Sequence, residues 1–473
     1  GISPAAPEDG ASGEAWRIGH ARKATALSRL WAPARARIAL PAMSRPHANR
    51  VNASDDPLLA SLGLTLVFFA LCLWRIATPS SHYFDEVHYL PAARELLAGT
   101  AYRNPEHPPL GKEIIALGIA LFGDNPWGWR FFPVLAGATT MFAAMRALWH
   151  VSHRQAATLA YGVLLATGFI LFVQSRIAML DIFMAAFVMT ALWLFAAACT
   201  ARSTARARGN LILAGIAIGC ALASKWNTIP LAPVCGLAFL VLRWRSVGTV
   251  RLLTARDAAP VRGVSLIEAA LWLGVLPVAV YAITFWPAYV LPGSPLAGRG
   301  PIASQEYMLA LQMSVKAFHP YQTHWSDWVL NTRGIWYAFN TYDGAVRGIF
   351  MIGNPLTMWL GLVALTWCAY AAVFLRRTDA AAVALLYAAS ILFWIVAAKP
   401  VQFYYHYFLP SCFQLAALAL AIDRLRELRQ RWAFWLVLAG SIALFAYFYP
   451  ILSACALEDK QGFMKWTWLK SWI

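Results

Sequence analysis

The sequence has little charge. Only 13% of its 473 residues are Asp, Glu, Lys or Arg, and 60% are hydrophobic, whereas soluble domains carry about 25% charged residues. This composition excludes an ordinary water-soluble fold, because so much apolar surface requires a lipid environment. We therefore expect an all-α integral membrane protein.

Acidic residues are the scarcer kind of charge. The chain has 22 Asp and Glu against 39 Lys and Arg, which gives a formal net charge of +17 at pH 7. In a membrane protein, Lys and Arg collect in cytoplasmic loops, where they also face anionic lipid. We accordingly expect membrane lipids as partners and no nucleic acid.

The sequence also lacks the motifs of several common sites. Its seven cysteines are scattered and show no CxxC or Cys/His spacing typical of zinc. Neither a Walker loop nor an HExxH motif is present. No cofactor and no metal site are therefore expected.

Residues 1–42 lack the apolar core of a signal peptide. They are rich in Ala, Arg, Pro and Gly, which favours a basic, disordered cytoplasmic segment over residues 1–56. Because Met43 closely precedes the first apolar run, we expect translation of the native protein to start there.

Eleven apolar runs are long enough to cross, or nearly cross, a hydrocarbon core of about 30 Å. They predict a bundle of about eleven transmembrane helices between residues 57 and 452. The runs are 57–74, 127–148, 156–173, 182–199, 211–223, 229–242, 266–287, 356–375, 380–398, 408–422 and 432–452.

Charge in the loops assigns the two sides of the membrane. Alternate loops are rich in Arg, as the positive-inside rule requires for cytoplasmic loops. The Arg-rich loops alternate in this way only if residues 107–123 do not cross the membrane but lie at its surface or re-enter it. The prolines and charges of HPPLGKE suit that placement. The N-terminus is then cytoplasmic, and the tail 453–473 is expected to form an amphipathic helix at the interface.

The other side of the membrane receives the unusual polar residues. They lie in a first outer loop over 75–126, where we expect short amphipathic helices, in a large outer loop over 288–355, and in three short loops. Charged groups at the ends of packed helices are costly unless they line a working cavity. The pattern predicts one functional site on the face away from the cytoplasm.

The residue types in these loops suit acid–base chemistry on an anionic substrate. Asp85 and Glu86 supply carboxylates that can accept a proton, and nearby cations can hold an anionic group. Arg176 and Asp181 lie close enough in sequence to form an ion pair. Lys225 stands between two apolar runs and needs a permanent anionic partner, either a carboxylate or a ligand phosphate.

Several short motifs occur in a fixed order along the chain. They are FDEVHY, HPPLGK, SRIAMLD, ASKW, HPY followed by IGNP, and YYHYFLP. In this order they resemble the protein O-mannosyltransferases, a GT-C family of glycosyltransferases that use polyprenyl-phosphate sugars. The resemblance covers about residues 57–422; each motif is weak alone, and the ordered set is specific.

The resemblance implies a GT-C bundle and an inverting transfer. A sugar, mannose or another hexose, would pass from a polyprenyl-phosphate donor to an acceptor hydroxyl, expected to be a protein Ser or Thr. The enzyme would lie in a bacterial inner membrane with its site facing the periplasm. Fixed cations would stabilise the leaving phosphate, so a divalent metal is not required, although the carboxylates leave room for one.

The matching positions imply roles for individual residues. Asp85 would be the catalytic base and Glu86 its neighbour in acceptor binding. Residues on the donor-phosphate side would be Lys112, Arg176, Lys225, Tyr405 and His406, and further site residues would be His107, Asp181, His319 and Tyr321.

Two alternatives remain open at this point. Eukaryotic members of the family carry a folded MIR domain in their largest outer loop, and residues 288–355 are too few to hold one, so the acceptor could instead be a lipid such as lipid A, or a polysaccharide. A transporter is less favoured, because transporters place charges near the midplane and show repeats, and we find no repeat.

Overall fold

The computed structural model describes residue 1, residues 55–397 and residues 399–473. The expectations for the N-terminal segment and for a start at Met43 fall almost entirely outside these residues. Residues Asp55–Ile473 form one compact unit.

Helices dominate this unit, and a helix occurs at each of the eleven predicted runs. The helices are α2 (Leu58–Leu73), α5 (Pro126–Ser152), α6 (Gln155–Ala166), α8 (Leu180–Cys199), α9 (Thr204–Ser224), α10 (Val234–Val247), α11 (Leu266–Ala270) continued by η3 (Leu271–Val275) and α12 (Leu276–Thr284), α16 (Pro355–Val373), α17 (Thr378–Val396), α18 (Phe408–Glu427) and α19 (Arg431–Leu452).

Eight of the helices within the described residues are long and apolar enough to cross a membrane, and α2 and α6 are shorter apolar helices. The multi-pass membrane bundle is therefore confirmed. The number of eleven crossings stays a prediction.

Close packing of α8, α9 and α12 sets one side of the bundle. α9 carries Gly215 and Gly219 in a small-xxx-small pattern that allows two helices to approach closely. A Cβ atom at Gly215 would lie 1.9 Å from the carbonyl oxygen of Trp272. Only glycine fits this contact, which fixes α9 and therefore the residue that follows its end.

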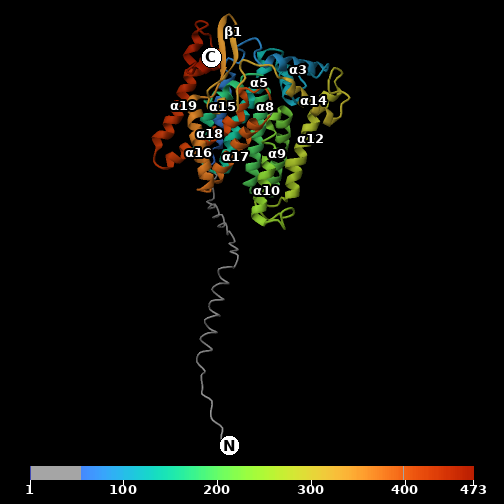
Figure 1. Ribbon diagram of the computed structural model, residues 1–473, viewed down its shortest axis with the longest axis vertical. Coiled ribbons are helices and arrows are strands. Elements are labelled where there is room, and N and C mark those ends of the chain that lie inside the picture. Colours follow the sequence, from blue (N-terminus) through green and yellow to red (C-terminus); the bar gives the residue numbers. More distant parts are fainter. Residues whose placement is uncertain (2–54, 398) are drawn as a thin grey trace. The chain divides into compact units, whose positions relative to one another are not determined.

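Short helices cover the end of the bundle that carries the predicted site. In the first outer loop, α3 (Glu86–Ala98) and α4 (Leu110–Phe122) are confirmed as two short helices. The 13 residues of α4 span about 20 Å, too short for a hydrocarbon core of about 30 Å. Figure 1 shows α3 at the same end of the bundle as strand β1.

The large outer loop contains a β-hairpin that the sequence analysis does not anticipate. After α13 (Trp286–Val290), α14 (Pro301–Ser314) and α15 (Trp325–Val329), strand β1 (Ile335–Tyr342) pairs antiparallel with β2 (Ala345–Met351). The register shifts between Trp336 and Ala338, which leaves Tyr337 unpaired with β2. The all-α class holds for the bundle, and the hairpin is its exception.

The C-terminal tail differs from the amphipathic helix expected for it. It forms two short 3₁₀ helices, η5 (Gly462–Trp466) and η6 (Lys470–Trp472). The Trp336 indole donates to the carbonyl of Trp472 at 3.1 Å, and the Trp472 indole donates to the carbonyl of Asn331 at 3.2 Å. The tryptophans thus satisfy their buried polar N–H groups at the hairpin and the segment before it.

Candidate active site

Asp85 lies at the start of α3 on a tight turn. The preceding residue, Phe84, has φ +49°, a left-handed conformation that is energetically unfavourable for a bulky residue. Its ring stacks on Tyr337 of β1 with centroids 4.1 Å apart. Among the described residues, the half-buried Asp85 carboxylate has no hydrogen-bond or ion-pair partner. It is therefore free to accept a proton from a substrate.

Glu86 has the opposite environment. Its carboxylate is buried and receives two hydrogen bonds of 2.8 Å from the Arg130 guanidinium. The backbone N–H groups of Tyr83 and Ala178 also donate to it, at 3.2 and 3.0 Å. The resemblance implied a part for Glu86 in acceptor binding, whereas its filled hydrogen-bonding positions make it an anchor for the turn that carries Asp85.

Arg130 completes that anchor. Besides the pair with Glu86, its N–H groups donate to the carbonyl oxygens of Ile76, Pro79 and Ser81 at 2.7 to 3.1 Å. All five guanidinium donors are therefore used inside the protein. The sequence analysis did not single out Arg130. The one feature that could have indicated it is its position as a cation near the outer end of a long apolar run.

Lys225 and Asp181 form a buried ion pair, with Nζ 2.6 Å from Oδ2. Asp181 lies in the first turn of α8, and Lys225 follows the last residue of α9. The Lys225 ammonium also lies 4.9 Å from the ring centre of Tyr405. The carboxylate partner considered for Lys225 in the sequence is thus Asp181, and Arg176 does not pair with Asp181.

The electric field of this pair reaches Asp85. Burial raises the pKa of the Asp85 carboxyl; the positive charge of Lys225 opposes that rise and the negative charge of Asp181 adds to it. A raised pKa makes a carboxylate a stronger base, so the position suits proton removal.

Lys399 is a second cation near these groups that sequence reasoning missed. Burial and the neighbouring charge of Lys225 lower its pKa to about 8, against the attraction of Asp181 and Asp85. In the sequence it follows an apolar helix and resembles an ordinary loop charge. Its proximity to Lys225 is a property of the folded chain.

Two histidines bring buried nitrogen atoms without partners to the site. The Nδ1 atom of His406 accepts a hydrogen bond from the Phe403 N–H at 3.0 Å, and the ring packs on Trp394 with centroids 4.0 Å apart. Its Nε2 atom and the Nδ1 atom of His107 have no partner in the described chain. Buried polar atoms normally find a partner, so both nitrogens indicate a polar ligand.

Other predicted site residues hold the surrounding loops instead. Arg176 donates to the carbonyls of Cys72 and Trp74, both at 2.6 Å, at the C-terminal end of α2. Lys112 donates to three carbonyls of the loop 103–107, at 2.7 to 3.3 Å. All three ammonium protons of Lys112 are used in this way, and Arg176 uses three of its five guanidinium donors on backbone carbonyls.

His319 and Tyr321 lie at the rim of the site. His319 is exposed, and its Nδ1 atom accepts a hydrogen bond from the Tyr321 N–H at 3.1 Å. The His319 ring contacts Phe403 with centroids 5.0 Å apart. The site therefore consists of a free carboxylate, a lysine–aspartate pair, a second lysine and two histidines, and within the described residues no group of three or more Asp, Glu, His or Cys suited to a metal occurs.

We predict that the buried Glu86–Arg130 pair is essential for stability. Arg130→Met leaves Glu86 buried without a counterion, which costs about 3–5 kcal/mol. The matched control is Arg94→Met, whose partner pair with Asp124 is 39% and 45% exposed and contributes about 1 kcal/mol at most. The thermal unfolding temperature in detergent should fall strongly for Arg130→Met only. Equal decreases in the two variants would contradict the anchoring role.

Sequence comparisons place this chain in a known family. The profile of the dolichyl-phosphate-mannose-protein mannosyltransferases matches residues 62–129 and 121–291. The profile of the C-terminal four TMM region of protein-O-mannosyltransferase matches residues 300–472. A polyprenol-phosphate-mannose–protein mannosyltransferase of Mycobacterium tuberculosis is 26% identical over 85% of this chain and 88% of the relative. One of Corynebacterium glutamicum is 27% identical over 72% and 77%.

Solved structures share the fold. The Saccharomyces cerevisiae Pmt1-Pmt2 complex bound to the sugar donor matches with a TM-score of 0.74 at 15% identity, over 89% of this chain and 93% of that chain. ArnT from Cupriavidus metallidurans bound to undecaprenyl phosphate matches with a TM-score of 0.57 at 15% identity, over 86% and 77%. The expected GT-C fold is therefore confirmed, and the chain belongs to the dolichyl-phosphate-mannose-protein mannosyltransferase family.

Proposed function

We propose that this protein transfers mannose from a polyprenyl-phosphate donor to a Ser or Thr hydroxyl of an acceptor protein, on the periplasmic face of a bacterial inner membrane. The observation that carries the proposal is the unpartnered Asp85 carboxylate beside the Lys225–Asp181 pair. The names of the bacterial relatives support the donor, the sugar and the acceptor class.

Asp85 is the proposed general base. The acceptor oxygen attacks the anomeric carbon of the sugar while Asp85 takes the hydroxyl proton. The bond between that carbon and the phosphate oxygen breaks, and polyprenyl phosphate leaves with the electron pair. A single displacement inverts the configuration at the anomeric carbon, and Glu86 supports the reaction only by fixing the turn.

Lys225 and Lys399 are the proposed partners of the leaving phosphate. The phosphate gains negative charge in the transition state, so a fixed cation stabilises the transition state more than the bound donor. The unpaired Nε2 atom of His406 offers a hydrogen bond to the same group. These groups supply the positive charge that a divalent metal would otherwise provide.

Two hollows between the helices suit the lipid part of the donor. A small pocket beside His406 is lined by residues of α8, the segment before α10, α17 and α18. Further along α8, α10, α17 and α18 lies a cavity of 210 Å³ whose lining is almost entirely apolar. Lining residues of this cavity include Met189, Val234, Ala238, Leu386 and Phe413. A polyprenyl chain with its phosphate near Lys225 would extend from the pocket beside His406 toward this cavity.

The base assignment predicts a large loss of activity in Asp85→Asn. Purified protein is supplied with polyprenyl-phosphate mannose and a Ser/Thr peptide, and the transfer rate should fall about 100-fold or more. Glu306→Gln, an exposed outer-loop acid, should keep the wild-type rate. If Asp85→Asn keeps most of the rate, the base is elsewhere; if only lipid acceptors are mannosylated, the acceptor class is wrong.

Asp85 and Lys399 predict a bell-shaped dependence of transfer rate on pH. The rate rises with pH as Asp85 ionises, above the range of a free Asp side chain because its pKa is raised. It falls again near pH 8 as Lys399 loses its proton. Lys399→Arg keeps the cation and should move the alkaline limb up by about one unit or more, whereas Lys316→Arg in the outer loop should not. An unchanged limb in Lys399→Arg would exclude this role.

The apolar cavity predicts a dependence on donor chain length. Ala238→Trp fills the cavity on α10 and should lower kcat/KM for a long-chain donor about tenfold or more, while a short isoprenoid donor is used normally. The neighbouring Leu237→Trp is the control, because Leu237 is 54% exposed and points away from the cavity. Equal effects of both variants on both donors would place the lipid elsewhere.

A further inference from the structure

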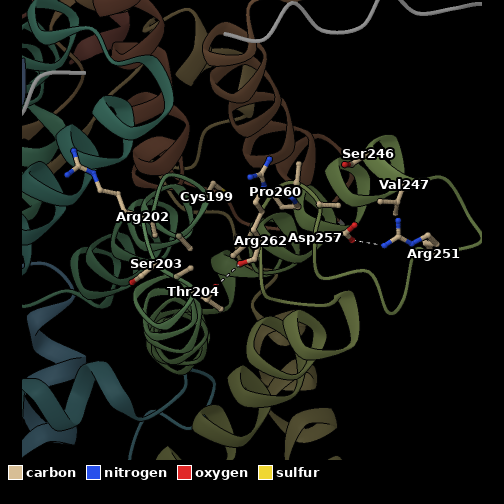
Figure 2. Close-up of a pocket in the computed structure, with 16 residues that line it drawn as sticks. Cys199, Arg202, Ser203, Thr204, Ser246, Val247, Arg251, Asp257, Pro260 and Arg262 are labelled. Atoms are coloured by element: carbon tan, nitrogen blue, oxygen red, sulfur yellow. Dashed lines mark hydrogen bonds and ion pairs between the residues drawn. The ribbon is translucent and has the colours of Figure 1, made fainter. Parts of the chain in front are cut away.

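A second cavity lies at the opposite end of the bundle from Asp85. Its volume is 680 Å³, and it is formed between the link from α8 to α9 and the loop that follows α10. Figure 2 shows the lining residues around the start of α9, with Arg202 at one edge, its guanidinium directed away from the cavity, and Arg251 at the other. None of these residues belongs to the site described above.

The helices fix the distance between the two sites. α8 has 20 residues, begins beside Asp181 and ends at Cys199, which lines the cavity. At about 1.5 Å per residue, α8 spans about 30 Å, the thickness of a hydrocarbon core. The cavity therefore lies at the level of lipid headgroups on the membrane face opposite the active site.

The charges of the cavity favour an anion. Arg202 and Arg262 line it, and neither has a carboxylate partner among the described residues. Arg251 is neutralised by Asp257 at 2.6 Å, so the net lining charge is positive. α9 also begins here, with Ser203 as its cap, and the positive end of a helix adds to the attraction for an anion.

A buried arginine holds the wall of the cavity in place. Arg243 of α10 is fully buried and donates to carbonyl oxygens of the loop at Ala259, Val261 and Val264, at 2.7 to 2.9 Å. Gly263 has φ +86° and packs against Thr204 at the start of α9. The loop is thus fixed to α9 and α10 before any ligand binds, which lowers the entropic cost of binding.

Apolar side chains beside the cavity indicate what kind of anion it takes. Val250 and Leu253 in the same loop are 96% and 56% exposed, and Trp244 at the end of α10 is exposed as well. Such side chains suit contact with acyl chains at a membrane surface. Basic pockets between helices at this depth are typical sites for anionic lipid headgroups.

We propose that this cavity binds the phosphate headgroup of an anionic phospholipid, with Arg262 as the charged ligand, Arg202 adding positive charge at the edge, and the apolar loop residues against the acyl chains. The ligand would be a diacyl phosphate such as phosphatidylglycerol. This binding is separate from the transfer reaction and does not depend on it.

Native mass spectrometry of the full chain with phosphatidylglycerol tests the proposal. The double variant R202Q/R262Q should bind the lipid about 30-fold more weakly than the wild type, because each arginine near an anionic lipid contributes about 1 kcal/mol. R429Q/R431Q is the matched control, since these arginines are exposed and lie outside the cavity. It should retain the lipid fully, as should D85N, whose defect lies in transfer.

Two results would overturn the proposal. Equal retention of phosphatidylglycerol by R202Q/R262Q and R429Q/R431Q would show that the lipid binds elsewhere. If inorganic phosphate displaced the lipid completely at millimolar concentration, the cavity would be a site for free phosphate. Wild-type thermal unfolding of R202Q/R262Q in a lipid-free detergent confirms that the variant is folded.

Discussion

The ion pair between Lys225 and Asp181 is the constraint on which the candidate site depends. α8 and α9 run antiparallel, so the start of one and the end of the other meet at the same face. Burying one of these charges alone would cost about 3–5 kcal/mol. The pair holds the Lys225 ammonium in a fixed position beside a carboxylate that has no partner of its own. Close packing of α9 through Gly215 sets the position of that charge.

Charged residues around this site form two groups: those whose hydrogen bonds hold the loops, and those that have no such partner. Glu86, Arg130, Arg176 and Lys112 use their hydrogen-bonding capacity on one another or on backbone carbonyls, and they hold the first outer loop and the end of α2. Asp85 has no such partner. Most of the charged groups therefore fix the loops in place. Such rigidity is needed because a base must be held within about 0.5 Å of its working position to be effective.

Much of this could be predicted from the sequence, and the remainder has a physical reason. Long apolar runs and Arg-rich loops determine the bundle, since hydrocarbon thickness and the positive-inside rule leave few choices. The motifs around Asp85, Lys225 and His406 are local, so they could be found as strings of letters. Whether a cation serves a ligand or a carbonyl depends on the folded loop, and Arg176 and Lys225 look alike in the sequence. Lys399 could not be recognised as a site residue, because its proximity to Lys225 arises only in the folded chain. The hairpin around Tyr337 was not predicted, because its short aromatic stretch resembles a membrane-interface segment.

The central claim is that the donor phosphate binds between Lys225 and Lys399, within reach of Asp85. A cryo-electron microscopy structure of the protein with polyprenyl phosphate would test it most directly. The account predicts phosphate density in contact with the Lys225 ammonium and an isoprenoid chain between α10 and α17. Phosphate density away from Lys225, with the Lys225–Asp181 pair undisturbed and the chain on another side of the bundle, would contradict it.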